Sequence, residues 1–333
     1  MSTAALGGGN AVREAAVRQF AKSARWRADE VLFWACALGS YFVFPDHLVL
    51  VTQVLISGLF ALSLDLLLGY TGIPSLGHAA FFGIGGYTAG LLSVAGWTEP
   101  LSGLIAAAAT AGVFGLLCSL VVARVGGIPL LTVTLGIGLL VFELANRWSG
   151  LTGGDDGLQG IVVAPVLSLF EFDLFGRTGF FYVLVVCFLL YLVVRRIVNS
   201  PFGLGLRGVR GNVRRMPALG VPVRRRVMAV FTLSAALAGV AGALLVQTTQ
   251  SAALDVVAFD RSVSVLIMLV LGGLGALSGG MIGAAVYLVA RDQLSTLDPV
   301  YWNFWLGLIL FLVVLVGGNG VLGLFDRLRR RRA

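Results

Sequence analysis

Long apolar runs alternate with short polar segments along most of the chain. The runs hold few charged residues, and several approach the roughly 20 apolar residues that a transmembrane helix needs. This pattern predicts an all-α fold, a polytopic transmembrane helical bundle of about 10 spans, with roughly eight to ten as the expected range. The candidate spans are Val31–Phe44, Leu48–Leu68, Ala79–Ala95, Leu101–Ala123, Pro129–Asn146, Gly179–Val194, Val227–Gln247, Ser262–Leu274, Met281–Leu294 and Tyr301–Val316.

The composition supports a membrane protein and disfavours several other classes. Of the 333 residues, 58% are apolar and only 12% are charged, whereas a soluble protein carries roughly 25% charged residues. A soluble enzyme, a disordered chain and a nucleic-acid-binding domain therefore fit poorly. The only lysine is Lys22, so the chain lacks the lysine of a phosphate-binding loop, and any ATP must be hydrolysed by another subunit. Two histidines and three scattered cysteines predict neither a metal site nor a cofactor.

The basic residues predict how the chain is oriented in the membrane. With ten spans and the N-terminus inside, 20 of the 24 basic residues fall on the cytoplasmic side, as the positive-inside rule requires. Both termini are then cytoplasmic. The expected divisions are a basic tail at residues 1–30, a transmembrane domain at 31–318 with a cytoplasmic loop at 195–226, and a basic tail at 319–333. The first apolar run is expected to be an uncleaved span, because its basic leader is long and bulky residues end it.

Two Gly-rich segments share one pattern. Residues 68–77 and residues 271–280 both follow LGxxGxxSxG, 203 residues apart. In the predicted topology, both lie at cytoplasmic turns between an inward and an outward span. Either the chain contains two parallel internal repeats, or the match arises by chance in a sequence rich in Gly and Leu.

The stretch from Leu64 to Gly90 concentrates Gly and Pro between two apolar runs. Irregular backbone at membrane depth is tolerated only where protein buries it or a cavity hydrates it. Such broken segments often point to a transport path. The alternative is a plain turn between two helices whose glycines allow close approach. The residues alone support both interpretations.

This stretch, LDLLLGYTGIPSLGHAAFFGIGGYTAG, resembles the permease subunits of ABC importers for branched-chain amino acids, of the LivM type, and their urea-transporting relatives. The family pattern is close to LNLLLGYxGxxSLGHAAFFGIGAYTAALL. Further blocks match in the same order, so that the resemblance covers roughly residues 48–325. These blocks are Arg124–Ile128, Thr134–Leu135, Leu151–Leu158, Arg207–Arg210, Ala218–Val221, Ser234–Leu244, Gly272–Gly275 and Ser278–Gly280.

The resemblance implies a multi-pass permease of the bacterial cytoplasmic (inner) membrane. Such a subunit moves branched-chain or other hydrophobic amino acids, or urea and short amides, into the cytoplasm by alternating access. The implied partners are a homologous second permease subunit, two ABC ATPase subunits, an extracytoplasmic substrate-binding protein and membrane lipid, with no nucleic acid and no cofactor.

The resemblance also assigns site residues. Those expected along the substrate pathway are Asp65, Thr71, Gly72, Ser75, Gly77, His78, Gly272, Gly275 and Ser278. Those expected to couple the chain to the ATPase are Arg207, Arg210, Asn212, Ala218, Leu219 and Gly220. Those expected to dock the binding protein are Thr152, Gly153, Gly154, Asp155 and Asp156.

Two places depart from the family pattern. Asp65 stands where the family usually has Asn, and an aspartate at a helix centre costs about 2.5–3.5 kcal/mol on membrane insertion. Because Asp65 lies about one turn from the expected cytoplasmic end, its carboxylate can reach toward water. A polar lining role and structural packing against Arg or Ser both stay open. The loop at 207–221 lacks the acidic residues of the family, so docking is expected to rely on Arg207, Arg210 and Leu219.

Several charged groups have alternative interpretations. The arginines of the cytoplasmic loop also suit a topological role in contact with anionic lipid, and Pro217 suits the first turn of a helix. Glu143 and Arg147 lie four residues apart and are expected to pair. The adjacent carboxylates of Asp155 and Asp156 are open to a cation, to a partner protein or to solvent alone.

A competing function is an ion-coupled secondary transporter of a small polar solute. That class favours carboxylates deep in the bundle, and only Asp65, Glu143 and Asp292 qualify, each near the end of a span. An integral-membrane enzyme would need clustered His, Asp or Cys at the membrane face, and the sequence has no such cluster. The sequence therefore favours the permease subunit and leaves its substrate open.

Overall fold

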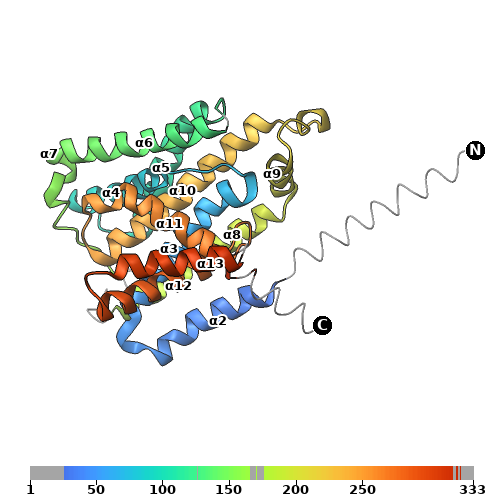
Figure 1. The fold of residues 1–333 in the computed structure, drawn as a ribbon. Helices are drawn as coiled ribbons and strands as arrows, with labels where there is room; N and C mark the ends of the chain where they lie inside the picture. Colours follow the sequence, from blue (N-terminus) through green and yellow to red (C-terminus); the bar gives the residue numbers. More distant parts are fainter. Residues whose placement is uncertain are drawn as a thin grey trace, which may run out of the picture.

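The computed structural model describes residues 26–125, 127–165, 170, 176–317, 320, 321 and 323. Within them the chain is helical, and an isolated β-bridge joins Leu158 to Ala252 (Figure 1). The helices are α2 (Ala28–Val43), α3 (Leu48–Thr71), α4 (His78–Val94), α5 (Pro100–Val122), α6 (Ile128–Arg147), α7 (Ser149–Thr152), α8 (Arg177–Val198), α9 (Pro201–Gly211), α10 (Val223–Thr249), α11 (Phe259–Gly272), α12 (Gly279–Leu297) and α13 (Trp302–Gly317). Short 3-10 turns are η1 (Pro45–His47), η2 (Gly154–Asp156), η3 (Pro217–Leu219) and η4 (Leu254–Val256).

The predicted apolar runs coincide with helices. Each of the ten runs falls on a separate helix, and the boundaries differ by four residues or fewer. Prolines open α5, α6 and α9 at the first or second helical position, where their fixed φ suits the helix and no N–H is needed. The all-α, helical-bundle class is therefore confirmed for the described residues.

Five helical segments are long and apolar enough to cross a membrane. They are Pro45–Thr71, Pro100–Val122, Pro129–Arg147, Arg177–Val198 and Val223–Thr249. The remaining predicted spans are shorter or more polar, so the count of ten membrane crossings stays a prediction. The basic tails predicted at 1–30 and 319–333 lie almost entirely outside the described residues.

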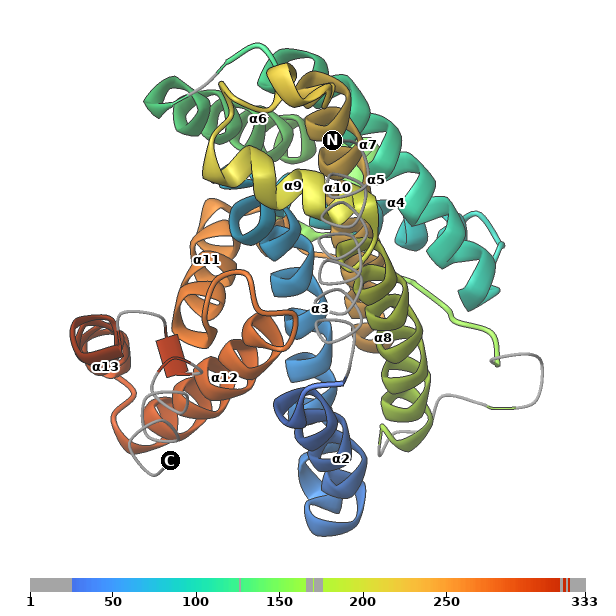
Figure 2. The same ribbon diagram turned by 90° about the vertical axis from the view of Figure 1, so that its right-hand side faces the viewer.

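Helices α3 and α10 form the centre of the bundle. Their apolar windows are 67% and 72% buried, whereas that of α6 is only 22% buried. Helices α4 and α5 pack on α10, and α12 packs on α3 with α11 beside it (Figure 2). Helices α6 and α13 lie at the periphery in the same view. The core is therefore built on α3 and α10, whereas the peripheral helices α6 and α13 have few neighbours within the chain.

Small residues allow α4, α5 and α10 to touch through their backbones. A Cβ at Gly85 of α4 would fall 2.1 Å from the carbonyl oxygen of Gly239, and one at Gly242 would fall 1.8 Å from that of Phe82. On the other side of α10, a Cβ at Gly115 would lie 2.3 Å from the Cβ of Ala235. Helices in membranes associate closely where such residues line the contact. We call this contact the α4–α10–α5 seam.

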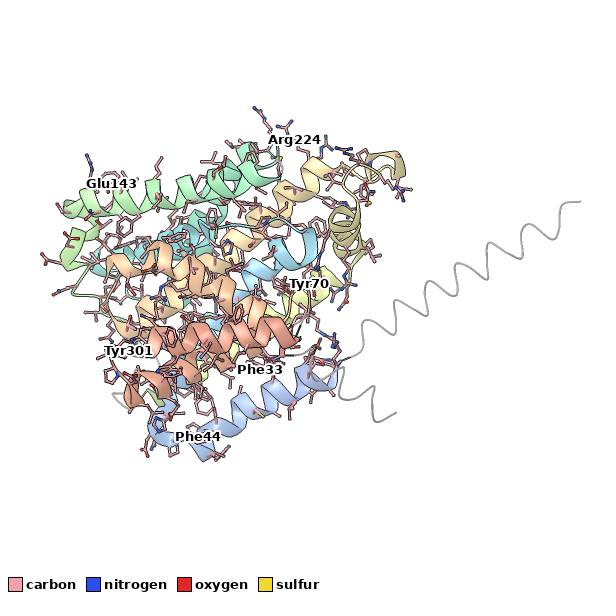
Figure 3. The ribbon with its side chains drawn as sticks, viewed as in Figure 1. Phe33, Phe44, Tyr70, Glu143, Arg224 and Tyr301 are labelled. Carbon is pink, nitrogen blue, oxygen red and sulfur yellow. The ribbon has the colours of Figure 1, made fainter. Side chains whose placement is uncertain are left out.

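Helix ends that the sequence assigns to one side of the membrane lie at one end of the bundle. Phe44, Glu143 and Tyr301 project at one end, and Tyr70 and Arg224 at the opposite end (Figure 3). This arrangement agrees with the predicted topology, in which successive helices cross the membrane in opposite directions.

Candidate functional site

The connection between α3 and α4 runs back along α3. Helix α3 ends at Thr71 and α4 begins at His78, whose Nε2 lies 2.9 Å from the Oγ of Ser63. Ser63 precedes Thr71 by eight residues, which is about 12 Å along a helix. Residues 72–77 therefore run back along α3 instead of forming a short turn at the end of the bundle. This geometry favours the broken-segment interpretation over the plain turn.

Other helices satisfy the backbone of this connection, which we call the first broken segment. The N–H of Leu76 donates to Thr134 Oγ1 of α6 at 3.2 Å, and the N–H of Ala79 donates to Ser262 Oγ of α11 at 2.9 Å. The first N–H groups of a helix have no partner within it, so the Ser262 hydroxyl satisfies an N–H in the first turn of α4, and the Thr134 hydroxyl satisfies the connection before it. Gly77 lies directly on α6, because a Cβ there would meet Thr134 O at 2.0 Å.

The predicted pathway residues at the start of this segment have different surroundings. Thr71 is buried and donates to Leu67 O at 2.5 Å. Gly72 ends α3 in the left-handed conformation with φ +74°, which favours glycine. Ser75 is buried, and its hydroxyl has no hydrogen-bond partner among the described residues. Gly72 is exposed, whereas Ser75 and Gly77 are enclosed.

His78 is a core residue in this conformation. It is fully buried and stacks on Phe60 with the ring centroids 5.5 Å apart, and Phe81 closes the edge at 5.6 Å. Its Nε2 also lies 3.4 Å from Ser234 Oγ of α10, which donates to Ser63 O at 2.5 Å. The imidazole thus links α3, α4 and α10, and its Nδ1 has no partner in the described part of the chain.

The second Gly-rich segment meets the first beside α3. The N–H of Gly275 donates to Asp65 Oδ1 at 2.8 Å, and Ser278 Oγ donates to Asp29 Oδ2 of α2 at 2.5 Å. Gly272 packs on α12, where a Cβ would fall 1.8 Å from Gly279 O. The two segments that share one sequence pattern are therefore neighbours in space. We call residues 273–278 the second broken segment.

Asp65 differs from its sequence expectation. Its carboxylate does not reach toward water, because the side chain is fully buried and bonded to the Gly275 amide. The partner lies 210 residues away in the sequence, so local spacing offered no sign of it. The sequence analysis considered packing of Asp65 against Arg or Ser, and in the structure a backbone N–H also donates to its carboxylate.

The segment at 195–226 contains α9 and the turn η3. Ser200 caps α9 by accepting from the Phe202 N–H at 3.2 Å. Arg210 donates through Nη1 to Gly69 O at the end of α3, and the Arg207 guanidinium lies 5.4 Å from the ring centroid of Tyr70. Both arginines therefore have partners on α3 in this chain.

The remaining predicted coupling residues form the outer loop. Asn212 Oδ1 accepts from the N–H groups of Arg214 and Arg215 at 3.1 and 3.2 Å, which fixes the loop. Pro217 opens η3, as expected for a first helical turn. Ala218, Leu219 and Gly220 are all exposed. Leu219 is 73% exposed and Gly220 ends the turn at φ +74°, so an apolar side chain projects from a formed turn.

The TGGDDG loop combines a buried base with an exposed acidic tip. Thr152 is buried and donates to Ala145 O at 2.5 Å, while Gly153 and Gly154 adopt φ of +80° and +58°. Asp155 and Asp156 in η2 are exposed. Only these two side chains of the predicted docking set project from the loop.

The predicted pair on α6 is confirmed. Arg147 Nε donates to Glu143 Oε1 at 2.5 Å, and both side chains are exposed. Among the described residues, no group of three or more His, Cys, Asp or Glu side chains is placed to hold a metal ion. A cavity of about 160 Å³ lies between α11, α12 and α13, and its lining is mostly apolar, with Asn303 and Tyr287 among the lining residues.

Comparison with known proteins identifies the family. Residues 48–320 match the model of the branched-chain amino acid transport system / permease component family. The chain is 30% identical to the high-affinity branched-chain amino acid transport system permease protein LivM of Escherichia coli K12, over 81% of this chain and 68% of that protein. It is 26% identical to the probable LivM permease of Methanocaldococcus jannaschii, over 77% and 86% of the two chains.

The chain is also similar to the second permease type. It is 26% identical to the LivH permease protein of Escherichia coli K12, over 80% of this chain and 90% of that one. No solved structure matches. Permease relatives together with several membrane-length apolar helices identify a multi-pass inner-membrane transporter subunit rather than an enzyme. The chain belongs to the family of permease components of branched-chain amino acid transport systems.

Proposed function

We propose that this chain is the membrane-spanning permease subunit of an ATP-driven ABC importer. It moves branched-chain or other hydrophobic amino acids, or urea and short amides, into the cytoplasm by alternating access. The observation that carries the proposal is that both broken segments lie beside α3 and against Arg210 of α9, since a Cβ at Gly72 would lie 3.3 Å from Arg210 Cγ and one at Gly275 would lie 2.9 Å from Arg210 Nη1. Irregular backbone buried within a bundle is a common feature of substrate paths, and α9 connects this place to the exposed loop at Leu219.

Separate ATPase subunits supply the energy. The only lysine, Lys22, lies in the N-terminal tail, so no phosphate-binding loop is available in this chain. A homologous second permease completes the pathway, and two ATPases lie beneath the permease pair, where the loop around η3 provides this chain's docking site. The similarity of this chain to both LivM and LivH permeases supports a second permease of the same fold.

An extracytoplasmic binding protein delivers the substrate. The exposed carboxylates of Asp155 and Asp156 at the tip of the TGGDDG loop suit a basic patch on that protein. The buried Thr152 hydroxyl and the left-handed glycines hold the loop in one shape, so the acidic tip is already formed before docking.

The alternative, an ion-coupled secondary transporter of a small polar solute, is favoured only by the buried carboxylate of Asp65. Glu143 is exposed and paired with Arg147, and Asp65 accepts from a backbone amide through Oδ1, while its Oδ2 has no hydrogen-bond partner among the described residues. A carboxylate that carries a coupling ion must bind and release it during each cycle, which suits an unpaired group better.

The test is uptake by proteoliposomes that contain this chain, the second permease and both ATPases. With binding protein present, we expect accumulation of leucine, isoleucine or valine that requires ATP and persists with a protonophore and without sodium. The purified chain alone is expected to show no ATP hydrolysis. Uptake driven by a proton or sodium gradient without ATP would instead establish the secondary transporter.

The predicted orientation can be tested by thiol labelling in intact cells. In a background in which Cys36, Cys118 and Cys187 are replaced by serine, Asp155→Cys and Thr296→Cys are expected to react with an impermeant maleimide added outside. Arg225→Cys is expected to react only after the cells are permeabilised, which also shows that this thiol is reactive. Labelling of Arg225→Cys in intact cells would contradict the orientation and the assignment of the coupling loop.

A further inference from the structure

The second broken segment is held to α3 by one buried carboxylate. Asp65 is fully buried, and its Oδ1 accepts from the N–H of Gly275 at 2.8 Å. Gly69, one helical turn further along α3, makes room for this contact. A Cβ at Gly69 would fall 1.9 Å from Asp65 Oδ1 and 2.6 Å from the Gly275 nitrogen. The missing side chain at Gly69 therefore allows the hydrogen bond to form.

Arg210 of α9 lies against the same contact. Its Nη1 donates to Gly69 O, and a Cβ added at Gly275 would lie 2.9 Å from that nitrogen. Burial disfavours the ionised form of the Asp65 carboxyl, whereas the Gly275 amide and then the nearby charge of Arg210 favour it. The contact between α3 and the second broken segment thus includes a cation that belongs to the cytoplasmic segment and moves with it.

The opposite end of the second broken segment is held by α2. Ser278 Oγ donates to Asp29 Oδ2 at 2.5 Å. The next residue of α2, Glu30, pairs with Arg195 of α8 at 3.2 Å with both side chains largely buried. Two aspartates therefore hold the segment, Asp65 at Gly275 in its middle and Asp29 at Ser278 at its end, and Arg210 of α9 lies against the Gly275 contact.

We propose that Asp65 is a positioning residue that closes the second broken segment on α3, and that Arg210 makes this closure depend on the position of α9. If α9 withdraws Arg210, the Asp65 carboxylate stays buried without its cation. A buried charge that loses its partner is strongly disfavoured. The closed arrangement then becomes less stable, and residues 273–278 separate from α3. This role in coupling rests on the proposed function, but the contact itself does not.

The test uses Leu277→Cys as a reporter, because Leu277 is a buried residue of the segment and separation from α3 would expose it. The full chain, without its native cysteines, is placed in nanodiscs and its labelling rate by a soluble maleimide is measured. Arg210→Gln is expected to raise the rate about tenfold, since the charge-assisted contact is lost. In the Asp65→Asn background, the same Arg210→Gln change is expected to alter the labelling rate less than about twofold. Asparagine is uncharged, so the loss of Arg210 leaves no buried carboxylate without a cation.

The two backgrounds separate this role from general loosening. Asparagine keeps an acceptor for the Gly275 amide and has the size of aspartate, and glutamine at position 210 stays polar while it removes the charge. Arg224→Gln removes an exposed arginine from the start of α10 and serves as the matched control with an unchanged rate. The proposal would be overturned if Arg210→Gln raised the labelling rate equally with Asp65 and with Asp65→Asn, or if it raised the rate in neither background.

A second measurement separates this proposal from the proposed function. In the complete complex, we expect the labelling rate of Leu277→Cys to change with ATP when Asp65 is present, and to become independent of ATP in Asp65→Leu. An ATP-dependent rate in Asp65→Leu would overturn the role in coupling. A wild-type complex that fails to import amino acids with ATP contradicts the proposed function alone, because labelling of the isolated chain needs neither substrate nor ATPase.

Discussion

Leu219→Asp is expected to abolish the stimulation of ATP hydrolysis by substrate-loaded binding protein. Leu219 is 73% exposed on the turn η3, and an apolar side chain on a formed turn is suited to a groove in a partner. Anchors of this kind contribute at least about 2 kcal/mol, roughly 30-fold in affinity. Replacing the anchor with a carboxylate would also bury an unpaired charge. The measurement is ATPase activity of the reconstituted complex with and without binding protein.

The arginines of the same loop provide the matched control. Arg214→Ala and Arg215→Ala remove exposed charges, and the loop keeps its shape because Asn212 bonds the backbone N–H groups of both residues. Exposed charges contribute little at physiological salt, so stimulation should fall by less than about twofold. If these two variants abolished stimulation while Leu219→Asp retained it, electrostatic attraction and not the apolar side chain would dominate the contact with the ATPase.

Gly77→Ala is expected to stop transport through a steric effect alone. The backbone of Gly77 has φ −104°, which alanine adopts without strain, but the added Cβ would meet Thr134 O at 2.0 Å and Gly138 N at 3.0 Å. Both contacts are backbone, so α6 or the first broken segment must move. Overpacking of this kind typically costs about 1–3 kcal/mol, and we expect transport to fall at least about tenfold.

Gly136→Ala, midway between Thr134 and Gly138 on α6, is the control. No atom lies within 4 Å of a Cβ at this position, and alanine favours the helix. We expect unchanged transport and an unchanged or slightly higher melting temperature. Membrane insertion and assembly with the second permease are measured for both variants, so that loss of transport is assigned to the pathway. Normal transport by Gly77→Ala would show that the contact with α6 has no role.

Much of the fold could be predicted because it depends on local sequence. The ten apolar runs correspond to helices since apolar length and helix formation are both properties of contiguous residues. Local chemistry likewise explains the Glu143–Arg147 pair and the position of Pro217 at the start of η3. The glycine-rich stretch was recognised for the same reason, although its two interpretations could not be separated without the fold.

The contacts of the candidate site could not be predicted because each partner is distant in the sequence. His78 meets Ser63 and Ser234, 15 and 156 residues away. Serine and threonine hydroxyls that bond backbone groups, such as Ser262 and Thr134, resemble ordinary small residues of an apolar run. The roles in transport and coupling assigned from the family stay predictions.

The α4–α10–α5 seam has a consequence for how access to the pathway can alternate. Close backbone contact leaves little room between these helices, the Phe81 ring packs against Phe114 and Phe231, and densely packed interiors shift as units rather than deform continuously. The three helices therefore act as one rigid body during any conformational cycle. The motion that opens one side and closes the other must occur in the parts joined to this body by hydrogen bonds and single side chains, namely the two broken segments and the outer helices.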